Sequence, residues 1–521
     1  MKYTVRNIRL MPEEPLDQLK KKAAAALKIS PNTITDWKIV RRSLDARKKN
    51  DIHYVFSLDI ATNHDVLSES EYSYDHLEQY DGPRPVIVGF GPAGMFAGLI
   101  LARSGLKPLI IERGQRVEQR NDTVDLFRKT GILNCESNAQ FGEGGAGTFS
   151  DGKLNTGTHD SRISFILNEF FRHGASESVL YDAKPHIGTD VLVTIIKNIR
   201  NEILSLGGEI RFETKFENLI ISDHKLSGIT VTGPSGPETV SCNHLILAIG
   251  HSSRDTFEAL FRQKIPMERK AFSMGARIEH PQKDINISQY GADRGKLPAA
   301  DYSLSIHFPD GTSAYSFCMC PGGYVFAAAS EKNAVCTNGM SYSGRSGANA
   351  NSALLVTLHE QEFPGEGVLA GMQWQRDIER KAYDYALSAG PYFAPAQLVK
   401  DFLSGTPSSG PGSVLPTYLP GVRWGDIRCV LPDRITSVLS RAIPEFERKI
   451  HGFSASDAVL TAPETRSSSP VRILRSRDCE SVISGLFPCG EGAGYAGGIT
   501  SAAVDGVRCA EALIAKIKGD C

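Results

Sequence analysis

One glycine-rich turn between two apolar strands constrains the fold of this chain more than any other feature. The apolar run at 85–88 leads into Gly89-Phe90-Gly91-Pro92-Ala93-Gly94, and an apolar stretch with helical periodicity follows over 93–103. A second apolar run at 108–111 ends directly before Glu112. Strand, glycine turn, helix, strand and acid in this order predict a βαβ unit that binds a dinucleotide.

Each glycine of this turn has a mechanical role. Gly89 permits the tight turn, Gly91 lets a pyrophosphate approach the backbone, and Gly94 lets the helix pack closely on the strand. The helix N-terminus at Pro92 and Ala93 offers free N–H groups and partial positive charge to the phosphates. The sequence therefore predicts that the pyrophosphate binds here.

The acid that ends the unit is Glu112, which is 23 residues after Gly89. At this spacing a carboxylate can accept hydrogen bonds from the hydroxyl groups of an adenosine ribose. We expect Glu112 and its neighbour Arg113 to contact the adenosine part of the ligand.

A second glycine string, Gly142-Glu143-Gly144-Gly145-Ala146-Gly147, has the same spacing but a different context. The preceding residues 137–141 do not read as a buried strand, and no suitably spaced acid follows. We reject it as a second dinucleotide fold, because the glycines predict such a fold only when a buried strand precedes them and a spaced acid follows.

Length and composition limit the class of protein. A chain of 521 residues predicts two or three domains, and its net charge of −1 shows no bias toward nucleic acid or membrane. The N-terminus lacks the apolar segment of a signal peptide, and the ten cysteines are scattered without CxxC pairs. We expect a cytoplasmic protein with no membrane span and no metal site.

Residues 1–80 look like a separate α+β module. Runs at 3–10, 37–42 and 53–60 read as strands, and 16–27 has helical periodicity, which gives a βαββ order. Residues 1–60 hold 13 Lys/Arg against 7 Asp/Glu, a net charge of +6. A solvated surface explains this charge, and a contact surface for RNA or a protein partner is the alternative.

Three later segments resemble parts of glutathione-reductase-like FAD folds. The strand at 208–216, with Lys215 and Phe216, resembles the adenine-side strand. The run at 244–251, with Ala248 and Gly250, resembles the crossover strand that ends in Ala-Thr-Gly, with Ile249 in place of Thr.

The third segment, 485–494, resembles the distal FAD motif. Its acid, Glu491 after Gly490, would meet a ribityl hydroxyl, and Gly497-Gly498-Ile499 then open the final helix. The N-terminus of this helix would stabilise negative charge on the reduced flavin. This return motif favours FAD over NAD.

Over nearly its full length the chain resembles bacterial FAD-dependent dehydrogenases of unassigned substrate, in the glutathione-reductase-type flavoprotein superfamily. The strings that carry this resemblance include 43–47, 141–154, 317–323, 337–341 and 464–471. The resemblance implies an α/β chain with a Rossmann-like FAD-binding domain, an inserted α+β substrate domain and the small N-terminal βαββ module. We place the module at 1–80, the FAD-binding domain at 81–270 and 456–521, and the substrate domain at 271–455.

The resemblance also implies that the loop at 142–154 lines the pyrophosphate and the isoalloxazine ring. Its candidates are Gly142, Gly144, Gly145, Gly147 and Ser150 for FAD. Lys153 lies near the flavin or a substrate carboxylate in this interpretation, and a surface lysine is the alternative.

Two further sets of residues are catalytic candidates. Cys318 and Cys320 would face the same side of a strand with Met319 opposite, and so relay electrons beside the flavin, or they are structural cysteines. No basic neighbour in the sequence lowers a thiol pKa. Arg466, in a Ser/Thr-rich loop, would clamp an anionic substrate through its two-pronged guanidinium, or would cap carbonyl groups.

The chain is therefore expected to be an FAD-dependent oxidoreductase that transfers hydride between flavin N5 and a small organic substrate, with an anion as one candidate. NAD(P)H or an electron-transfer protein is an alternative redox partner, although the chain has no second nucleotide fold. An RNA-associated flavoprotein and a non-catalytic FAD redox sensor are the alternative functions.

Overall fold

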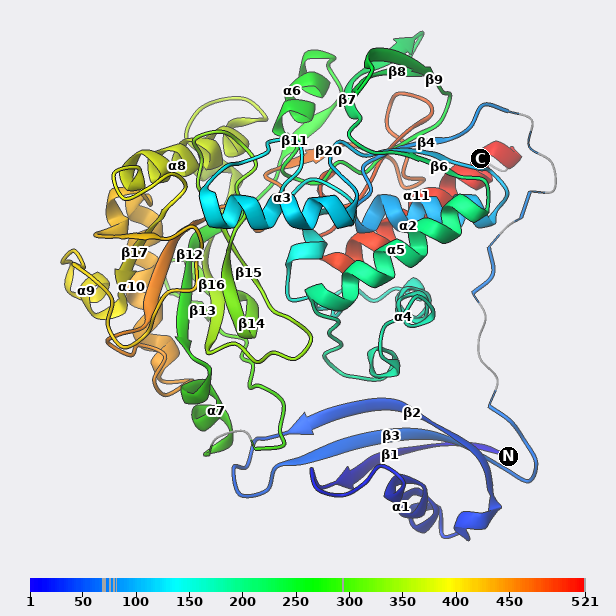
Figure 1. Cartoon of the computed structure of the whole chain (residues 1–521). Coiled ribbons are helices and arrows are strands. Elements are labelled where there is room, and N and C mark those ends of the chain that lie inside the picture. The colour runs from blue at the N-terminus through cyan, green and yellow to red at the C-terminus, as the bar shows by residue number, and fades with distance from the viewer. Residues whose placement is uncertain (68–71, 75, 78–79, 81, 293–294, 520–521) are drawn as a thin grey trace.

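The structure is a computed structural model that describes residues 1–67, 72–74, 76–77, 80, 82–292 and 295–519. It has an N-terminal module, a parallel-sheet region and a second region built on a larger sheet (Figure 1). Asp81, in the predicted linker, lies outside the described residues.

The N-terminal module is one antiparallel sheet with a helix packed on it. Strand β3 lies between β1 and β2, and α1 buries Leu19, Ala23 and Ala24 against them. Its elements are β1 (Lys2–Leu10), α1 (Gln18–Leu27), a short 3-10 helix η1 (Pro31–Thr33), β2 (Ile34–Asp45) and β3 (His53–Thr62).

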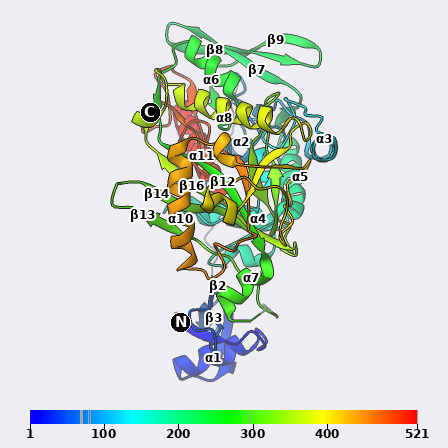
Figure 2. The ribbon, with the colours of Figure 1, turned by 90° about the vertical axis from the view of Figure 1, so that its left-hand side faces the viewer.

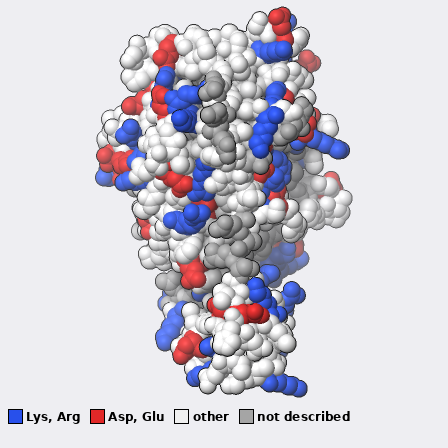
Figure 3. All heavy atoms as spheres, turned by 90° about the vertical axis from the view of Figure 1, so that its right-hand side faces the viewer, with Lys and Arg blue, Asp and Glu red and all other residues white. Residues whose placement is uncertain are grey.

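Arg42 of β2 attaches the module to the rest of the molecule. Its N–H donates to the Tyr181 carbonyl at 2.8 Å, and its own carbonyl accepts from Ala183 N at 2.8 Å. Its side chain pairs with Asp182, with 2.6 Å between Nε and Oδ1. Figure 1 shows the module at the bottom of the molecule, and Figure 3 shows both signs of charge interspersed over one face.

The parallel-sheet region contains the predicted FAD motifs and is called the FAD-type region below. Its strands have the order β21-β10-β4-β5-β6. Its apolar strands β4, β5, β10 and β21 are fully buried, because helices cover one face and a small sheet covers the other. The strands are β4 (Val86–Val88), β5 (Leu109–Ile111), β6 (Glu209–Arg211), β10 (Leu245–Leu247) and β21 (Leu486–Pro488).

Helices α2, α4, α5 and α11 pack on one face of that sheet, and α6 packs with the small sheet on the other. Helix α11 packs along α2, so the C-terminal segment returns beside the first βαβ unit (Figure 1). The helices are α2 (Pro92–Arg103), α3 (Val117–Thr130), η2 (Gly145–Phe149), α4 (Arg162–Arg172), η3 (Glu177–Leu180), α5 (Thr189–Ser205), α6 (Arg254–Arg262) and α11 (Ile499–Lys518). The small covering sheet is β7 (Lys215–Ser222), β8 (Lys225–Gly233) and β9 (Gly236–Ser241), seen at the top of Figure 2.

The second region is an eight-stranded sheet with β12 and β16 at its centre. Both are almost wholly buried, because α8 and α10 contact this sheet and the FAD-type region packs beside it. Its strands are β12 (Phe272–Pro281), β13 (Ser305–His307), β14 (Ser313–Ala327), β15 (Thr337–Met340), β16 (Asn349–Leu358), β17 (Ala394–Leu398), β18 (Val422–Trp424) and β19 (Val459–Glu464). Its helices are α7 (Gln282–Tyr290), η4 (Glu360–Glu362), α8 (Ala370–Ala386), α9 (Val399–Ser404), η5 (Ile427–Cys429) and α10 (Asp433–Glu447).

The boundary expected at 455/456 falls before the end of this sheet. Strand β19 pairs with β12 and β17, so 459–464 lie in the second sheet and not in the C-terminal return. The chain then passes through β20 (Val471–Ile473), which pairs with β11 (Met267–Arg269), before it reaches β21.

Candidate active site between the two sheets

A cavity of about 490 Å³ lies where the parallel sheet meets the second sheet. The turn after β4, the loop 140–153, the end of β10 and the start of α11 form one side, and β14 and β15 form the other. Most residues predicted to hold the cofactor line it: Gly89, Gly91, Pro92, Ala93, Glu112, Arg113, Gly142, Gly145, Gly147, Ser150, Lys215, Phe216, Ala248, Gly250, Glu491, Gly497, Gly498 and Ile499.

The glycines of the first turn have two roles: some pack against neighbouring backbone, and Gly91 leaves space for a ligand. A Cβ on Gly94 would lie 1.9 Å from the Gly89 carbonyl oxygen, so Gly94 packs against the turn and does not line the cavity. Gly89 has a φ of +98°, and its Cβ would lie 2.2 Å from the Ala248 carbonyl oxygen. Gly91 is open, because its Cβ would meet only Gly145 Cα at 3.7 Å.

Two helix N-termini border the cavity without a capping side chain. Gly91 is the N-cap of α2 and Gly498 is the N-cap of α11, and neither helix has an acid in its first turn. Their free N–H groups and partial positive charge fit a pyrophosphate at α2 and an electron-rich ring edge at α11. Gly490, predicted to contact the cofactor, does not line the cavity, because its N–H donates to Asp505 at 2.7 Å.

Glu112 joins three loops around the cavity. Its Oε2 accepts from Phe90 N at 2.8 Å, and its Oε1 accepts from Gly114 N and Gly142 N, both at 2.9 Å. A carboxylate has about four acceptor positions, so one remains for a ribose hydroxyl. The ribose contact of Glu112 stays a prediction.

The second glycine string forms the wall of the cavity opposite α2. Buried Arg120 fixes it by donating to the carbonyl oxygens of Asn138, Ala139 and Glu143 at 2.7 to 3.1 Å. Gly144 points away from the cavity, where a Cβ would lie 2.4 Å from Ile196.

Arg113 and Lys215, the charged candidates on the adenine side, both pair with Asp255. Arg113 places its two terminal nitrogens 2.8 and 3.0 Å from the oxygens of Asp255, and Lys215 Nζ lies 3.0 Å from the same carboxylate. Both side chains line the cavity, and Arg113 also lies over the ring of Phe141 at 4.2 Å.

Lys153 belongs to a buried charge cluster at the other end of the cavity. Asp151 lies 3.0 Å from Lys153 Nζ and 2.7 Å from Arg345 Nη2, and it accepts a hydrogen bond from Ser341. Burial raises the pKa of Asp151, but Lys153 and Arg345 outweigh this and keep the pKa below its usual value. The cluster has two cations and one carboxylate, and this excess positive charge faces the cavity.

His186 adds a neutral ring to this cluster. Its Nε2 lies 3.7 Å from Asp151 Oδ1. Burial, followed by the charge of Arg345, lowers the pKa of His186 to about 4. The buried atoms His186 Nε2, Lys153 Nζ and Arg345 Nε have no hydrogen-bond partner among the described residues.

The cysteine pair departs from the predicted strand alternation. Cys318 has a φ of +42°, and the pairing of β14 with β16 shifts between Phe317 and Cys320. This β-bulge breaks the expected alternation, because it inserts an extra residue into β14. Cys318 and Met319 both line the cavity, whereas Cys320 is buried behind them.

The structure supplies the basic neighbours that the sequence did not reveal. A hydrogen bond with Cys320, opposed by burial and helped by Lys153 and Arg277, lowers the pKa of Cys318 to about 6. Arg277 Nη1 donates to the Cys318 carbonyl oxygen at 3.2 Å. The pKa of Cys320 moves in the opposite direction because of its burial.

The guanidinium of Arg466 is paired with an acid, which favours the structural alternative over a substrate clamp. Its Nε and Nη2 donate to the two oxygens of Glu379 at 2.9 and 2.7 Å, and its Nη1 donates to Ser252 and Ser330. Arg254 makes a second pair of hydrogen bonds to Glu379, both at 2.8 Å. The two-pronged face of Arg466 is therefore already used, although the side chain borders the cavity.

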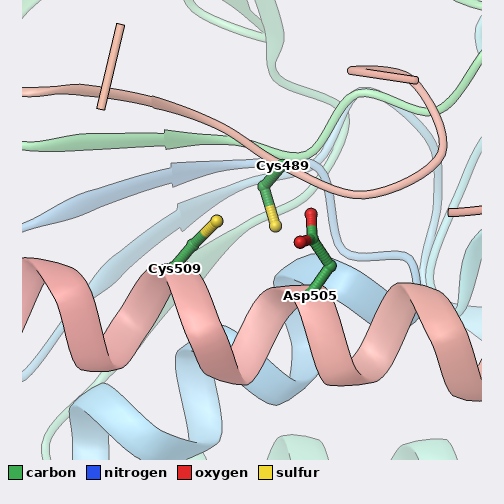
Figure 4. Close-up of side chains that lie close together, drawn as sticks. All are labelled: Cys489, Asp505 and Cys509. Carbon is green, nitrogen blue, oxygen red and sulfur yellow. The ribbon is translucent and has the colours of Figure 1, made fainter. Parts of the chain in front are cut away.

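Among the described residues, two groups of buried or half-buried side chains have the spacing of metal ligands. One is Cys489, Asp505 and Cys509, with the last two on α11 and Cys489 just after β21 (Figure 4). Arg475 already pairs with Asp505 at 2.6 Å. The other group is Glu169, His173 and Glu202, whose two acids pair with Arg103. A cation would have to displace a guanidinium in either group, and the absence of a metal site stays a prediction.

Family models match residues 1–61 and 84–467. Residues 84–283 match an FAD binding domain, 271–467 match the C-terminal domain-like region of an FAD-dependent protein, and 1–61 match a domain of unknown function. An uncharacterized protein of Clostridium beijerinckii is 46% identical over 534 residues, which covers 99% of both chains. These matches identify FAD as the cofactor.

Solved structures show only distant similarity. A triple mutant of the flavin-dependent brominase Bmp2 is 13% identical, covers 84% of this chain and 81% of its own, and has a TM-score of 0.38. A geranylgeranyl bacteriochlorophyll reductase-like protein from Thermoplasma acidophilum is 14% identical, covers 84% and 79%, and has a TM-score of 0.38. No helix in the described part of the chain combines the length and apolar character that a membrane span requires.

Proposed function

The chain belongs to a family of FAD-dependent flavoproteins, and we propose that it is an oxidoreductase whose flavin exchanges hydride with a small organic anion. The observation that carries this proposal is the shared cavity. Its open helix N-termini suit FAD, and the Lys153–Asp151–Arg345 cluster lies at its other end. FAD supplies the redox chemistry, and the protein supplies binding, orientation and charge.

The cofactor end uses the backbone more than side chains. The α2 N-terminus holds the pyrophosphate, since Gly91 leaves space there, and Glu112 accepts from the ribose. Glu491 lines the cavity, with one oxygen 3.2 Å from His251 Nδ1, and it binds the ribityl chain. The N-terminus of α11 faces the flavin and favours negative charge on it.

The substrate end uses charge. Asp151 neutralises only one of the two cations Lys153 and Arg345, so one positive charge is left for the Cys318 thiolate or for an anion that enters the cavity. Burial disfavours the ammonium of Lys153, but Asp151 and the nearby thiols raise its pKa, which keeps it charged. Lys153 and Arg345 therefore orient a carboxylate or another anionic group of the substrate.

The first experiment is to purify the protein and record its visible spectrum. It is then reduced anaerobically with small hydroxy acids, amino acids and NAD(P)H as candidate donors. A colourless protein that stays free of FAD when FAD is added would exclude the proposal. If only NAD(P)H reduces the flavin, NAD(P)H and not an organic anion is the hydride donor.

The second experiment tests the substrate end. Replacing Lys153 by glutamine is expected to raise KM for an anionic donor about tenfold, because one charged hydrogen bond of about 1.5 kcal/mol is lost. The control is Lys400→Gln, whose side chain is 52% exposed on α9. Equal KM values in the two variants would contradict the anionic substrate.

An RNA-associated flavoprotein is the second candidate function, because residues 1–60 carry a net charge of +6. Part of this charge is paired within the module, as in Lys22 with Glu14, or with the main body, as in Arg42 with Asp182. Both signs of charge are interspersed on the face shown in Figure 3. Salt-dependent tRNA binding by the full chain would favour this function. An absence of binding at low salt would exclude it.

A further inference from the structure

The bulge in β14 brings two cysteines together at the wall of the cavity. Phe317 pairs with Ala353 and Cys320 pairs with Asn351, so three steps along β14 match two steps along β16. A strand rises about 3.3 Å per residue, so each step in the bulge advances by only about 2.2 Å. Cys318 and Cys320 are therefore only about 4.4 Å apart along the strand axis, compared with about 6.6 Å for two regular strand steps.

The side chains of the two cysteines also lie close together. The thiol of Cys320 donates to the Cys318 carbonyl oxygen at 3.1 Å, and the two thiols share a hydrogen bond that favours the thiolate of Cys318. Both cysteines are free in this structure. To form a disulfide, the Cys320 thiol would leave the Cys318 carbonyl oxygen and bond to the Cys318 sulfur.

The surroundings give the two thiols different roles. Cys318 is half-buried and lines the cavity, whereas Cys320 is fully buried. Lys153 and Arg277 both favour the charged form of Cys318, and Arg277 Nη1 lies 3.9 Å from the sulfur of Cys320. This arrangement suits an accessible attacking thiolate backed by a second, resolving thiol.

A left-handed backbone at a non-glycine residue costs about 1–3 kcal/mol, and such residues cluster at functional sites. The strain at Cys318 lies in a wall of the cavity and not at a surface turn. Lys153, which is paired with Asp151 at 3.0 Å, lines the same cavity. Two independent features therefore mark this position as a site of chemistry.

We propose that Cys318 and Cys320 form a dithiol–disulfide couple that carries two electrons between FAD and an external disulfide. This inference rests on the proposed function, since it supplies the electron outlet of the same site. The chemical class of the acceptor is a disulfide, either of a small molecule or of a protein.

The electron count of each step balances. When the Cys318–Cys320 disulfide is reduced, its S–S bond breaks, and two electrons and one proton come from anionic reduced FAD, which leaves Cys318 as a thiolate and Cys320 as a thiol. The Cys318 thiolate then attacks one sulfur of the external disulfide and releases a thiolate. Cys320 gives its proton to that thiolate and attacks the resulting mixed disulfide at Cys318, which restores the internal S–S bond and releases the second thiolate.

The first test counts electrons in the FAD-loaded protein. Air-oxidised protein is titrated anaerobically with dithionite, and the electrons consumed are compared with those needed to bleach the flavin. We expect wild-type protein to consume about twice as many electrons as its flavin alone accepts. Cys320→Ser should consume only the flavin's share, and the control Cys429→Ser, which removes an exposed cysteine, should match wild type.

The second test reads the thiols without any activity measurement. Mass spectrometry of the air-oxidised protein should find the peptide containing Cys318 and Cys320 with two hydrogens missing, and mild reduction should restore them. In the fully reduced wild-type protein, alkylation of Cys318 by iodoacetamide should be at least tenfold faster at pH 7 than alkylation of Cys429, because the hydrogen bond from Cys320 and the charges of Lys153 and Arg277 favour its thiolate.

The outcomes separate this inference from the proposed function. Normal flavin reduction without extra electrons and without the internal disulfide overturns the couple and leaves the oxidoreductase intact. A protein that does not bind FAD overturns the proposed function, and the mass-spectrometric result still decides whether the disulfide forms. A disulfide that forms but consumes no electrons during flavin reduction also overturns the couple.

Discussion

Replacing Gly91 by alanine should separate FAD binding from folding. Gly91 has a φ of −77°, which any residue can adopt, and the new Cβ would meet only Gly145 Cα at 3.7 Å. The cost to folding is that of alanine for glycine at a helix N-cap, about 1 kcal/mol. The variant should therefore fold.

The cost to FAD binding should be larger, because the methyl group would occupy the wall of the cavity at the α2 N-terminus. A pyrophosphate displaced from there loses about two hydrogen bonds to a charged group, each worth about 1.5–3 kcal/mol. A loss of about 3 kcal/mol corresponds to roughly a hundredfold weaker binding.

The assay is a titration of the apoprotein with FAD by flavin fluorescence, together with urea unfolding of the apoprotein. The control is Gly157→Ala, at an exposed position where an added Cβ meets nothing within 4 Å. The contrast is Gly94→Ala, whose Cβ would lie 1.9 Å from the Gly89 carbonyl oxygen and should destabilise folding itself by about 1–3 kcal/mol. A folded Gly91→Ala protein with wild-type FAD affinity would refute the placement of the pyrophosphate.

Two further predictions concern stability. Glu379→Gln should lower the free energy of unfolding by about 3 kcal/mol, seen as a lower urea midpoint, because it leaves Arg254 and Arg466 buried without their shared counterion; an unchanged midpoint would contradict this role. His186 should make the protein less stable as the pH falls from about 6.5 to about 4, because the unfolded chain binds this proton at its ordinary pKa and the folded protein binds it only near pH 4. The free energy of unfolding falls by about 3 kcal/mol over this range. His186→Gln should remove that part of the pH dependence of urea unfolding. A pH profile identical to that of wild type would show that another group titrates.

The cofactor end could be read from the sequence because its signals are local. Gly89, Gly91 and Gly94 lie within one turn, and Glu112 follows on the adjacent strand, so their roles depend on a short stretch of backbone. The distal segment was also readable, since Glu491 lies between an apolar strand and a helix in the expected order. The roles of these residues therefore do not depend on contacts with distant parts of the chain.

The substrate end could not be read in the same way. The bulge at Cys318 is defined by pairing with β16, and nothing in the local sequence marks an extra residue there. Arg277 reaches the thiols from β12, and Lys153 reaches them from a loop of the other region. The role of Arg466 depended on Glu379, an acid 87 residues away in the chain.

The non-local origin of the substrate end makes the docking of the two regions part of the chemistry. Lys153 comes from the FAD-type region and Cys318 from the second sheet, so their contact exists only while the regions keep their relative position. Glu379 on α8 binds Arg254 on α6 and Arg466 after β19, which ties the regions together beside the cavity. Arg466 was expected to bind substrate directly. Its pairing with Glu379 instead positions the walls of the cavity, so its removal should disturb the charge on Cys318 without any contact between the two residues.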